Sequence, residues 1–134
     1  METWRPRQQA TRRHPGTQFV LGQLAVTGQR GEDFLRWAPL IEELATCENL
    51  VGVKLGAIEE WRVHDPNPYL DWALRSFGFG RCMVEGNWFV SQALGARYTS
   101  SFEQVSDACL RLDATDDELR AVFQRNARRI YYSS

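Results

Sequence analysis

The sequence has few of the residues from which metal sites and disulfide frameworks are built. Its 134 residues include three cysteines, Cys47, Cys82 and Cys109, and two histidines, His14 and His64. The cysteines are far apart and form no Cys-x-x-Cys pair, so we expect buried, reduced thiols and a cytoplasmic location. No His-x-His or Cys–His cluster occurs, which argues against a metal site made by this chain alone.

An excess of charge, a long apolar segment and a phosphate-binding loop are also missing. The net charge is −1, so no strong field favours nucleic acid or anionic membranes as partners. No apolar run approaches the ~18 residues that indicate a membrane span. The basic N-terminus is not followed by the apolar core of a secretory signal. Gly28 and Gly31 lack the spacing of a phosphate loop, and Ser91 lacks the Gly-x-Ser-x-Gly context of a nucleophile.

What is present is ordinary for one soluble globular domain. Hydrophobic residues make up 43% of the chain and charged residues 25%. Residues 1–16 are rich in Arg, Gln, Thr and Pro, and we interpret them as an N-terminal arm. This arm is either frayed or the tail of a helix that ends at His14-Pro15-Gly16. Residues 17–134 carry the patterns of regular structure.

Three apolar segments have the length and composition of strands. These are residues 17–26, 50–58 and 81–86. The second segment is a near-continuous apolar run, which is typical of a strand buried on both faces. Loops are expected at 27–33, 59–66 and 89–99.

Helices are expected between and after these strands. Residues 33–46 repeat apolar side chains at helical spacing, although Pro39 should kink this helix or shift its regular part to start near residue 37. A second helix begins with Asn67 as the cap and Pro68 at the first position, and it stops at Gly78. The inward face of this helix should bury Leu70, Ala73, Leu74 and Phe77. Two further helices are expected after the third strand. The first should bury Phe102, Val105, Cys109 and Leu112, and the second should bury Leu119, Val122, Phe123 and Ile130.

The last two helices each begin with a capping-box pattern. Ser100-x-x-Glu103 opens one and Thr115-x-x-Glu118 opens the other. Arg125, Arg128 and Arg129 fall in the final turns, where they complement the helix dipole. The order is therefore strand, helix, strand, helix, strand, helix, helix. Strands joined by helical crossovers pair in parallel, so the fold class is α/β.

Four segments, in this order, resemble pieces of the amidohydrolase-related family, in its branch of lactone hydrolases and decarboxylases. Residues 14–25 resemble the sixth barrel strand of that family, usually Val-Leu-Asp-His-Leu-Gly. Residues 49–56, Asn-Leu-Val-Gly-Val-Lys-Leu-Gly, resemble the seventh, usually Asn-Val-Val-Lys-Leu-Ser-Gly. Residues 77–88, Phe-Gly-Phe-Gly-Arg-Cys-Met-Val-Glu-Gly-Asn-Trp, resemble the eighth, usually Phe-Gly-x-x-Arg-x-Met-Phe-Gly-Ser-Asp-Trp. Residues 123–131 resemble the closing helix, Phe-x-x-Asn-Ala-x-Arg-x-Tyr.

The resemblance implies a partial (β/α) TIM-like barrel made of the last three of eight strands. A complete barrel takes ~250 residues, so residues 17–134 are interpreted as its C-terminal portion. The implied activity is hydrolysis of a lactone or similar C–O bond in a small carboxylated substrate, or decarboxylation of an unsaturated acid. Members of the family often bind a divalent metal. Here Gln23 replaces the sixth-strand His, Gly22 its preceding Asp, and Asn87 the eighth-strand Asp, so we expect no metal cofactor from this chain.

Glu85 and Asn87 are the candidate catalytic residues. They are two positions apart, so both side chains belong to one face of an extended strand. Glu85 is a candidate acid or base, with the alternatives that it only forms an ion pair with Lys54 or is exposed at an open sheet edge. Asn87 is a candidate for orienting water or substrate, with the alternative that it only satisfies the backbone of a turn. A Glu-x-Asn variant of the Gly-x-Asp pattern also occurs in the family.

The candidate substrate-binding residues are Gln23, Lys54, Trp88 and Arg97. A cation inside an apolar run needs a partner, so Lys54 either binds a substrate carboxylate or forms a structural pair. Arg97 is a second candidate for the carboxylate. Trp88 either stacks on a planar ligand or packs over the end of the barrel.

Three parallel strands leave two open sheet edges, and each edge exposes unpaired backbone groups. We therefore expect a homo-oligomer or a companion chain that supplies the missing strands. The alternatives to an enzyme are a truncated, non-catalytic homologue that acts as a binding or assembly partner, and an unrelated small α/β binding module.

Overall fold

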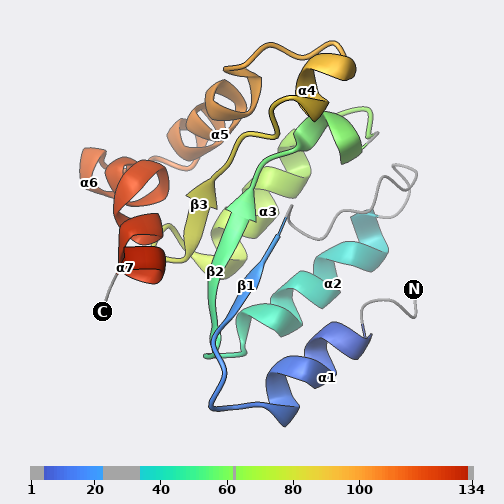
Figure 1. Cartoon of the computed structure of the whole chain (residues 1–134), viewed down its shortest axis with the longest axis vertical. Helices are drawn as coiled ribbons and strands as arrows, with labels where there is room; N and C mark the ends of the chain where they lie inside the picture. The colour runs from blue at the N-terminus through green and yellow to red at the C-terminus, as the bar shows by residue number, and fades with distance from the viewer. Residues whose placement is uncertain (1–4, 23–33, 62, 133–134) are drawn as a thin grey trace.

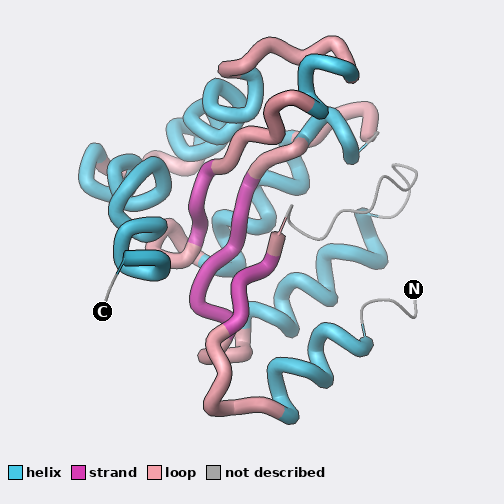
Figure 2. The backbone as a smooth tube through the Cα atoms, in the orientation of Figure 1, coloured by secondary structure: helices cyan, strands magenta, loops and turns pink. Residues whose placement is uncertain are grey.

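The computed structural model describes residues 5–22, 34–61 and 63–132. A three-stranded sheet lies in the middle, with α2 and α3 on one side and the C-terminal helices beside β3 (Figures 1 and 2). Among these residues no helix has the length and apolarity to cross a membrane. The elements are α1 (Arg5–Arg13), β1 (Phe19–Leu21), α2 (Phe34–Ala45), β2 (Leu50–Leu55), η3 (Ile58–Trp61), α3 (Asn67–Phe77), β3 (Cys82–Val84), α4 (Val90–Ala93), α5 (Ser100–Arg111), α6 (Asp116–Arg120), η4 (Ala121–Arg125) and α7 (Asn126–Tyr132).

The sheet is parallel, as the alternation predicts. Its order is β1-β2-β3, with Leu21 beside Val53 and Val53 beside Cys82. Each strand is shorter than its apolar segment. β2 ends at Leu55 because Ala57 has a φ of 53°, which an extended strand does not contain. Residues 23–26 of the first predicted strand lie outside the described residues.

One face of the sheet packs against the helices and forms the core. The face carries Leu21, Val53, Leu55 and Cys82, each at most 8% exposed. The helix faces predicted for 33–46 and 67–77 are confirmed. They bury Trp37, Ile41, Leu44, Leu70, Ala73, Leu74 and Phe77. Pro39 lies inside α2 and does not delay its start, and the Trp72 indole donates to the Ala38 carbonyl at 3.0 Å, which ties α3 to α2 next to the proline.

The capping predictions have mixed outcomes. Thr115 and Glu118 form the expected reciprocal capping box. Asn67 is not the cap of α3, because helical geometry already begins at Pro66. The Asp65 carboxylate accepts from the Asn67 N–H at 3.0 Å instead. Ser100 is likewise inside α5, and its predicted capping box is wrong. The preceding residue, Thr99, is the cap residue, without a side-chain cap bond. Two segments predicted as loops contain short helices, η3 and α4.

The C-terminal segment returns over the other face of the sheet. α6, a π-helical turn η4 and α7 follow one another without a break. A Cβ atom placed on Gly52 would lie 2.7 Å from Ile130 Cδ1 and from Met83 Cε, so a glycine in β2 lets this segment approach. Val122 is buried as predicted. Phe123 is 38% exposed, which corrects its predicted place in the core, because the π-helical turn changes the angular step between residues.

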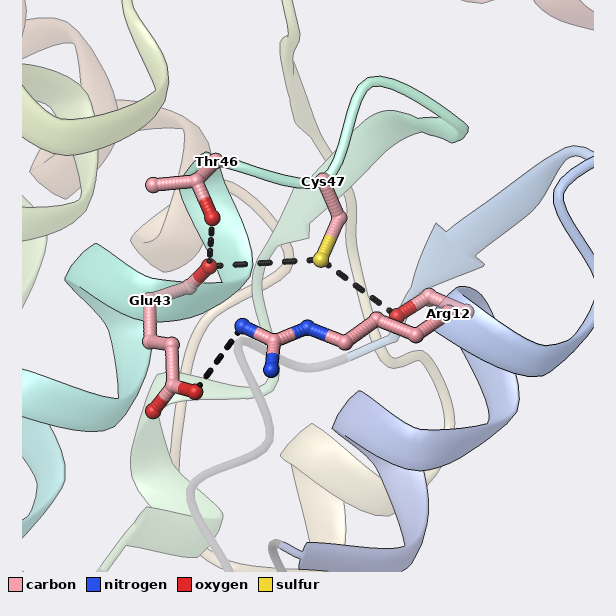
Figure 3. Close-up of polar contacts among 5 residues, drawn as sticks. Arg12, Glu43, Thr46 and Cys47 are labelled. Atoms are coloured by element: carbon pink, nitrogen blue, oxygen red, sulfur yellow. Dashed lines mark hydrogen bonds and ion pairs between the residues drawn. The ribbon is translucent and has the colours of Figure 1, made fainter.

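Helix α1 occupies Arg5–Arg13 within the N-terminal segment. It docks on the end of α2 through polar contacts (Figure 3). Arg12 pairs with Glu43 at 3.0 Å, and the Thr11 hydroxyl contacts the Cys47 sulfur at 3.4 Å. The Asn49 amide donates to the main-chain oxygens of Thr11, His14 and Thr17 at 2.8, 3.1 and 3.1 Å. This amide fixes the turn that leads from α1 into β1.

Candidate functional site at the carboxyl ends of the strands

Lys54 and Glu85 meet on the sheet face opposite the helical core. Lys54 is beside Met83 in the parallel register, and side chains alternate along a strand, so Lys54, Met83 and Glu85 share this face. The Lys54 Nζ lies 3.8 Å from Glu85 Oε2, with the two side chains 36% and 22% exposed. Lys54 is the only lysine in the chain. The ion pair expected between these residues is therefore present in a half-buried setting.

Two neighbouring residues, Tyr131 and Gly56, determine where this ion pair lies. The Lys54 ammonium lies 5.7 Å from the centre of the Tyr131 ring, so α7 closes the site toward the amino ends of the strands. Gly56 lies directly against Glu85. A Cβ atom at Gly56 would overlap the carbonyl group and the Cγ atom of Glu85. Glu85 takes its position because residue 56 has no side chain.

Asn87 forms the turn after β3. Its main-chain carbonyl accepts from the Ser91 N–H at 2.8 Å and contacts the Ser91 hydroxyl at 2.9 Å. Its side-chain Nδ2 is buried and has no hydrogen-bond partner among the described residues. An unsatisfied buried donor is costly, which favours a ligand oxygen as its partner. The main-chain contacts of Asn87 agree with a role in satisfying the backbone of the turn. Its side-chain nitrogen, which has no partner among the described residues, agrees with a role in binding a ligand.

Ser91 and Glu59 are members of this site that sequence reasoning missed. Ser91 is 5% exposed, and its hydroxyl donates to Glu59 Oε1. This bond joins η3, which follows β2, to α4, which follows β3. Ser91 lies four residues after Asn87, the spacing of one helical turn, but no local signal identifies Glu59 as its partner. The contact depends on the parallel pairing of β2 with β3.

The remaining candidates are dispersed. Trp88 is 39% exposed and makes an edge-to-face contact with Tyr98 at a ring distance of 5.3 Å. The Arg97 guanidinium binds Glu103 Oε2 at 2.6 Å on an exposed part of the surface. Gln23 lies outside the described residues. The structure therefore brings together Lys54 and Glu85, but it ties Arg97 to a different carboxylate.

The donors at the strand ends do not fit a divalent metal. The Glu85 carboxylate already faces an ammonium group, the Glu59 carboxylate accepts from the Ser91 hydroxyl, and the buried nitrogen of the Asn87 amide is a donor, not a ligand. Within the ranges that the structure describes, no three His, Cys, Asp or Glu side chains are grouped to hold a metal ion.

Arg81 and Asn126 hold the amino ends of the strands in place through hydrogen bonds to main-chain carbonyls. Arg81 donates to the carbonyls of Ala45 and Leu50 at 2.9 and 3.4 Å. Asn126 is 1% exposed and donates to the carbonyls of Phe79 and Cys82 at 2.6 and 2.9 Å. These residues hold the scaffold and lie at the end opposite the Lys54–Glu85 pair.

The fold and these segments are those of a partial (β/α) barrel. A family model of amidohydrolases matches residues 7–132, and the chain belongs to the amidohydrolase family. No curated protein matches it. Its structure is similar to two crystal structures of an amidohydrolase from Burkholderia multivorans, one with bound zinc (TM-score 0.83) and one with bound HEPES (TM-score 0.82). Both are 23% identical, and the match covers 99% of this chain and 50% of that chain.

The chain therefore spans about half the length of these solved structures and has the fold of a partial (β/α) barrel, as expected. The resemblance to the amidohydrolase-related family is confirmed.

Proposed function

We propose that this chain contributes the Lys54–Glu85–Asn87 group to a hydrolytic site for a lactone, or a similar C–O bond, in a small carboxylated molecule. The observation that carries the proposal is the meeting of Lys54 and Glu85 where β2 and β3 end, in a chain of the amidohydrolase family. The carboxyl ends of barrel strands are where barrel enzymes place their chemistry.

The ion pair suits a site that is activated by its substrate. A substrate carboxylate that binds the Lys54 ammonium competes with Glu85 for the same cation. Glu85 then acts as a general base and takes a proton from water while the water oxygen bonds to the lactone carbonyl carbon. The ring C–O bond breaks, and Glu85 returns the proton to the leaving alkoxide. The Asn87 amide, whose buried nitrogen has no other partner among the described residues, donates to the attacking water and orients it.

We expect the other wall of this site to come from strands outside the described residues. The matched solved structures are twice as long as the match, and β1 and β3 each pair with one strand among the described residues. In the proposed assembly, a second copy or a companion chain covers the face that bears Lys54 and Glu85.

The test is turnover of lactones that bear a carboxylate, followed by acid release. Glu85→Gln keeps the size of the side chain but removes the base, so we expect turnover to fall by about 100-fold or more. Glu42→Gln removes a carboxylate from an exposed position of α2 and serves as the matched control. Full turnover in Glu85→Gln contradicts the proposed role.

A second candidate function is a binding or assembly partner without catalysis. It is favoured by the pairing of Glu85 with Lys54, by Asn87 in place of an Asp, and by the pairing of Arg97 with Glu103. The rate of acetylation of Lys54, the only lysine, separates the two functions. A bound carboxylate is expected to slow the acetylation of Lys54. The N-terminal amine is the control, because slower acetylation there would indicate nonspecific protection. Shielding of Lys54 without turnover supports the binding partner. Shielding with turnover that Glu85→Gln abolishes supports the hydrolase.

A further inference from the structure

One face of the C-terminal helical segment carries a basic and aromatic stripe. Arg125, Arg128, Arg129 and Tyr132 follow the spacing i, i+3, i+4 and i+7, which places them on the same side of a helix. All four are exposed, and together they line an open cavity of about 780 Å³. Three guanidinium groups and no carboxylate are among these lining residues. We call these four residues the arginine stripe.

Two of the three guanidinium groups are held in place by the fold. Arg129 donates to the Gly80 carbonyl at 2.7 Å and to Asn126 Oδ1 at 3.2 Å. Arg125 donates to the Asp117 carboxylate at 2.9 Å and to the Asp117 carbonyl at 2.8 Å. A guanidinium has five N–H donors, so donors remain on Arg125 after its two bonds to Asp117. Groups fixed in this way lose less conformational entropy when an anion binds.

The third guanidinium completes the stripe. Arg128 forms no ion pair or hydrogen bond with any other residue that the structure describes, and its charge is available to a ligand. Complementing the helix dipole accounts for basic residues in a last turn. It does not account for the fixed bonds from Arg129 to the loop before β3 or for the cavity that the stripe lines.

We propose that the arginine stripe binds a small phosphorylated molecule with a planar ring, of the nucleotide class. Guanidinium groups match phosphate oxygens in a bidentate geometry, and the Tyr132 ring offers a surface for stacking. The volume falls within the range of ~300–1,000 Å³ that is typical of small-molecule sites. Gly80 precedes β3, so this site lies at the amino ends of the strands, away from the Lys54–Glu85 pair. It is independent of the proposed hydrolysis.

The test is calorimetric titration of the full chain with ATP, adenosine and tripolyphosphate. We expect ATP to bind more tightly than either of the other two. Arg128→Gln is expected to weaken ATP binding about tenfold, since one charge-assisted contact is lost. Arg36→Gln, an exposed position on α2, makes the same charge change and is expected to leave the affinity within about twofold. Tyr132→Leu is expected to reduce the advantage of ATP over tripolyphosphate.

Three results would overturn the proposal. The first is no binding of ATP at millimolar concentration in the unchanged chain. The second is an equal effect of Arg128→Gln and Arg36→Gln, which would indicate nonspecific attraction. The third is tighter binding of an oligonucleotide than of ATP, which would make the stripe a nucleic-acid surface instead. Unfolding curves of each variant verify that it folds like the parent chain.

Discussion

At the scale of single residues, the position of Glu85 depends on a residue with no side chain. Gly56 follows β2, and a methyl group there would overlap the Glu85 backbone and its Cγ atom. The overlap is with backbone, which relaxes less readily than the end of a flexible side chain. Gly56 is therefore a requirement of the candidate site and not only of the strand.

Gly56→Ala tests this dependence. We expect a loss of about 1–3 kcal/mol in the free energy of unfolding, because the core must shift to accept the methyl group. Gly80→Ala is the control, since a Cβ atom there meets nothing within 4 Å. Urea denaturation of both variants measures the difference. Equal midpoints for Gly56→Ala and the parent would show that the strand ends adjust freely.

The three cysteines are free thiols in the interior of this fold. All three are buried and form no disulfide. Burial raises the pKa of the Cys109 thiol to about 11, and burial together with the neighbouring Cys109 raises the pKa of Cys82 well above its usual range. A thiol with a pKa near 11 is ~0.1% thiolate at pH 8, and the thiolate is the reactive form.

We predict that the native chain reacts slowly with an aromatic disulfide reagent at pH 8, and that three thiols react at once in denaturant. The raised pKa values also determine the direction in which the free energy of unfolding changes with pH. The unfolded thiols lose protons near pH 9 while the folded thiols keep theirs, so the free energy of unfolding falls as pH rises from about 9 to about 11. Cys109→Ala is expected to flatten this slope. Rapid labelling of native Cys82 or Cys109 would show that the core opens.

At the scale of elements, strong periodicity predicted the helices, whereas two of the three predicted N-terminal caps were wrong. The apolar faces of α2 and α3 follow directly from residues such as Ile41 and Leu70. The Asn67 and Ser100 caps failed because Asp65 and Thr99 compete for the same helix ends one or two residues earlier. Which residue becomes the cap depends on the backbone conformation of the residues that lead into the helix, and a sequence pattern does not specify that conformation.

In the candidate site as well, some contacts could be predicted from the sequence and others could not. Alternation along β3 and the expected parallel pairing brought Lys54 and Glu85 together. The Ser91–Glu59 bond joins two short helices, η3 and α4, and no spacing signal links these residues, which are 32 positions apart. The ion pair of Arg97 with Glu103, six residues later in the chain, was not predicted either.

Asn126 is the polar residue that attaches the C-terminal helices to the sheet. Its amide donates to two main-chain carbonyls, and Asn126→Ala leaves both without a donor. We expect a loss of about 2–4 kcal/mol in the free energy of unfolding. Asn126→Asp should cost as much, because an ionised carboxylate accepts but does not donate.

Gln124→Ala is the matched control for this element, since Gln124 is exposed two residues before Asn126. It is expected to change the free energy of unfolding by less than about 0.5 kcal/mol. If Asn126→Ala were as stable as Gln124→Ala, the attachment of α7 would rest on apolar contacts such as Ile130 on Gly52 and not on the amide.

At the scale of the whole molecule, the described residues form a core on one face of a three-stranded sheet whose two edge strands each pair with β2 alone. Its helical face is covered, and part of the opposite face is covered by Ile130 and Tyr131. Beyond that cover, the Lys54–Glu85 pair is half-buried, and Trp88, Phe89 and Tyr98 are exposed near it in the sequence after β3. Exposed aromatic residues beside an open strand edge are typical of a surface that contacts another protein segment.

This arrangement predicts association of the chain in solution. We expect sedimentation to show a mass above the 15.5 kDa of one chain, increasing with concentration. Val20→Lys places a charge on β1, which pairs with only β2 among the described residues, and charges on edge strands oppose further pairing. The variant is expected to sediment closer to a monomer, provided that its circular dichroism and unfolding midpoint match those of the parent. A parent chain that remains a stable monomer at every concentration would contradict self-association, and the open face would then have to be covered by a different chain or remain in contact with water.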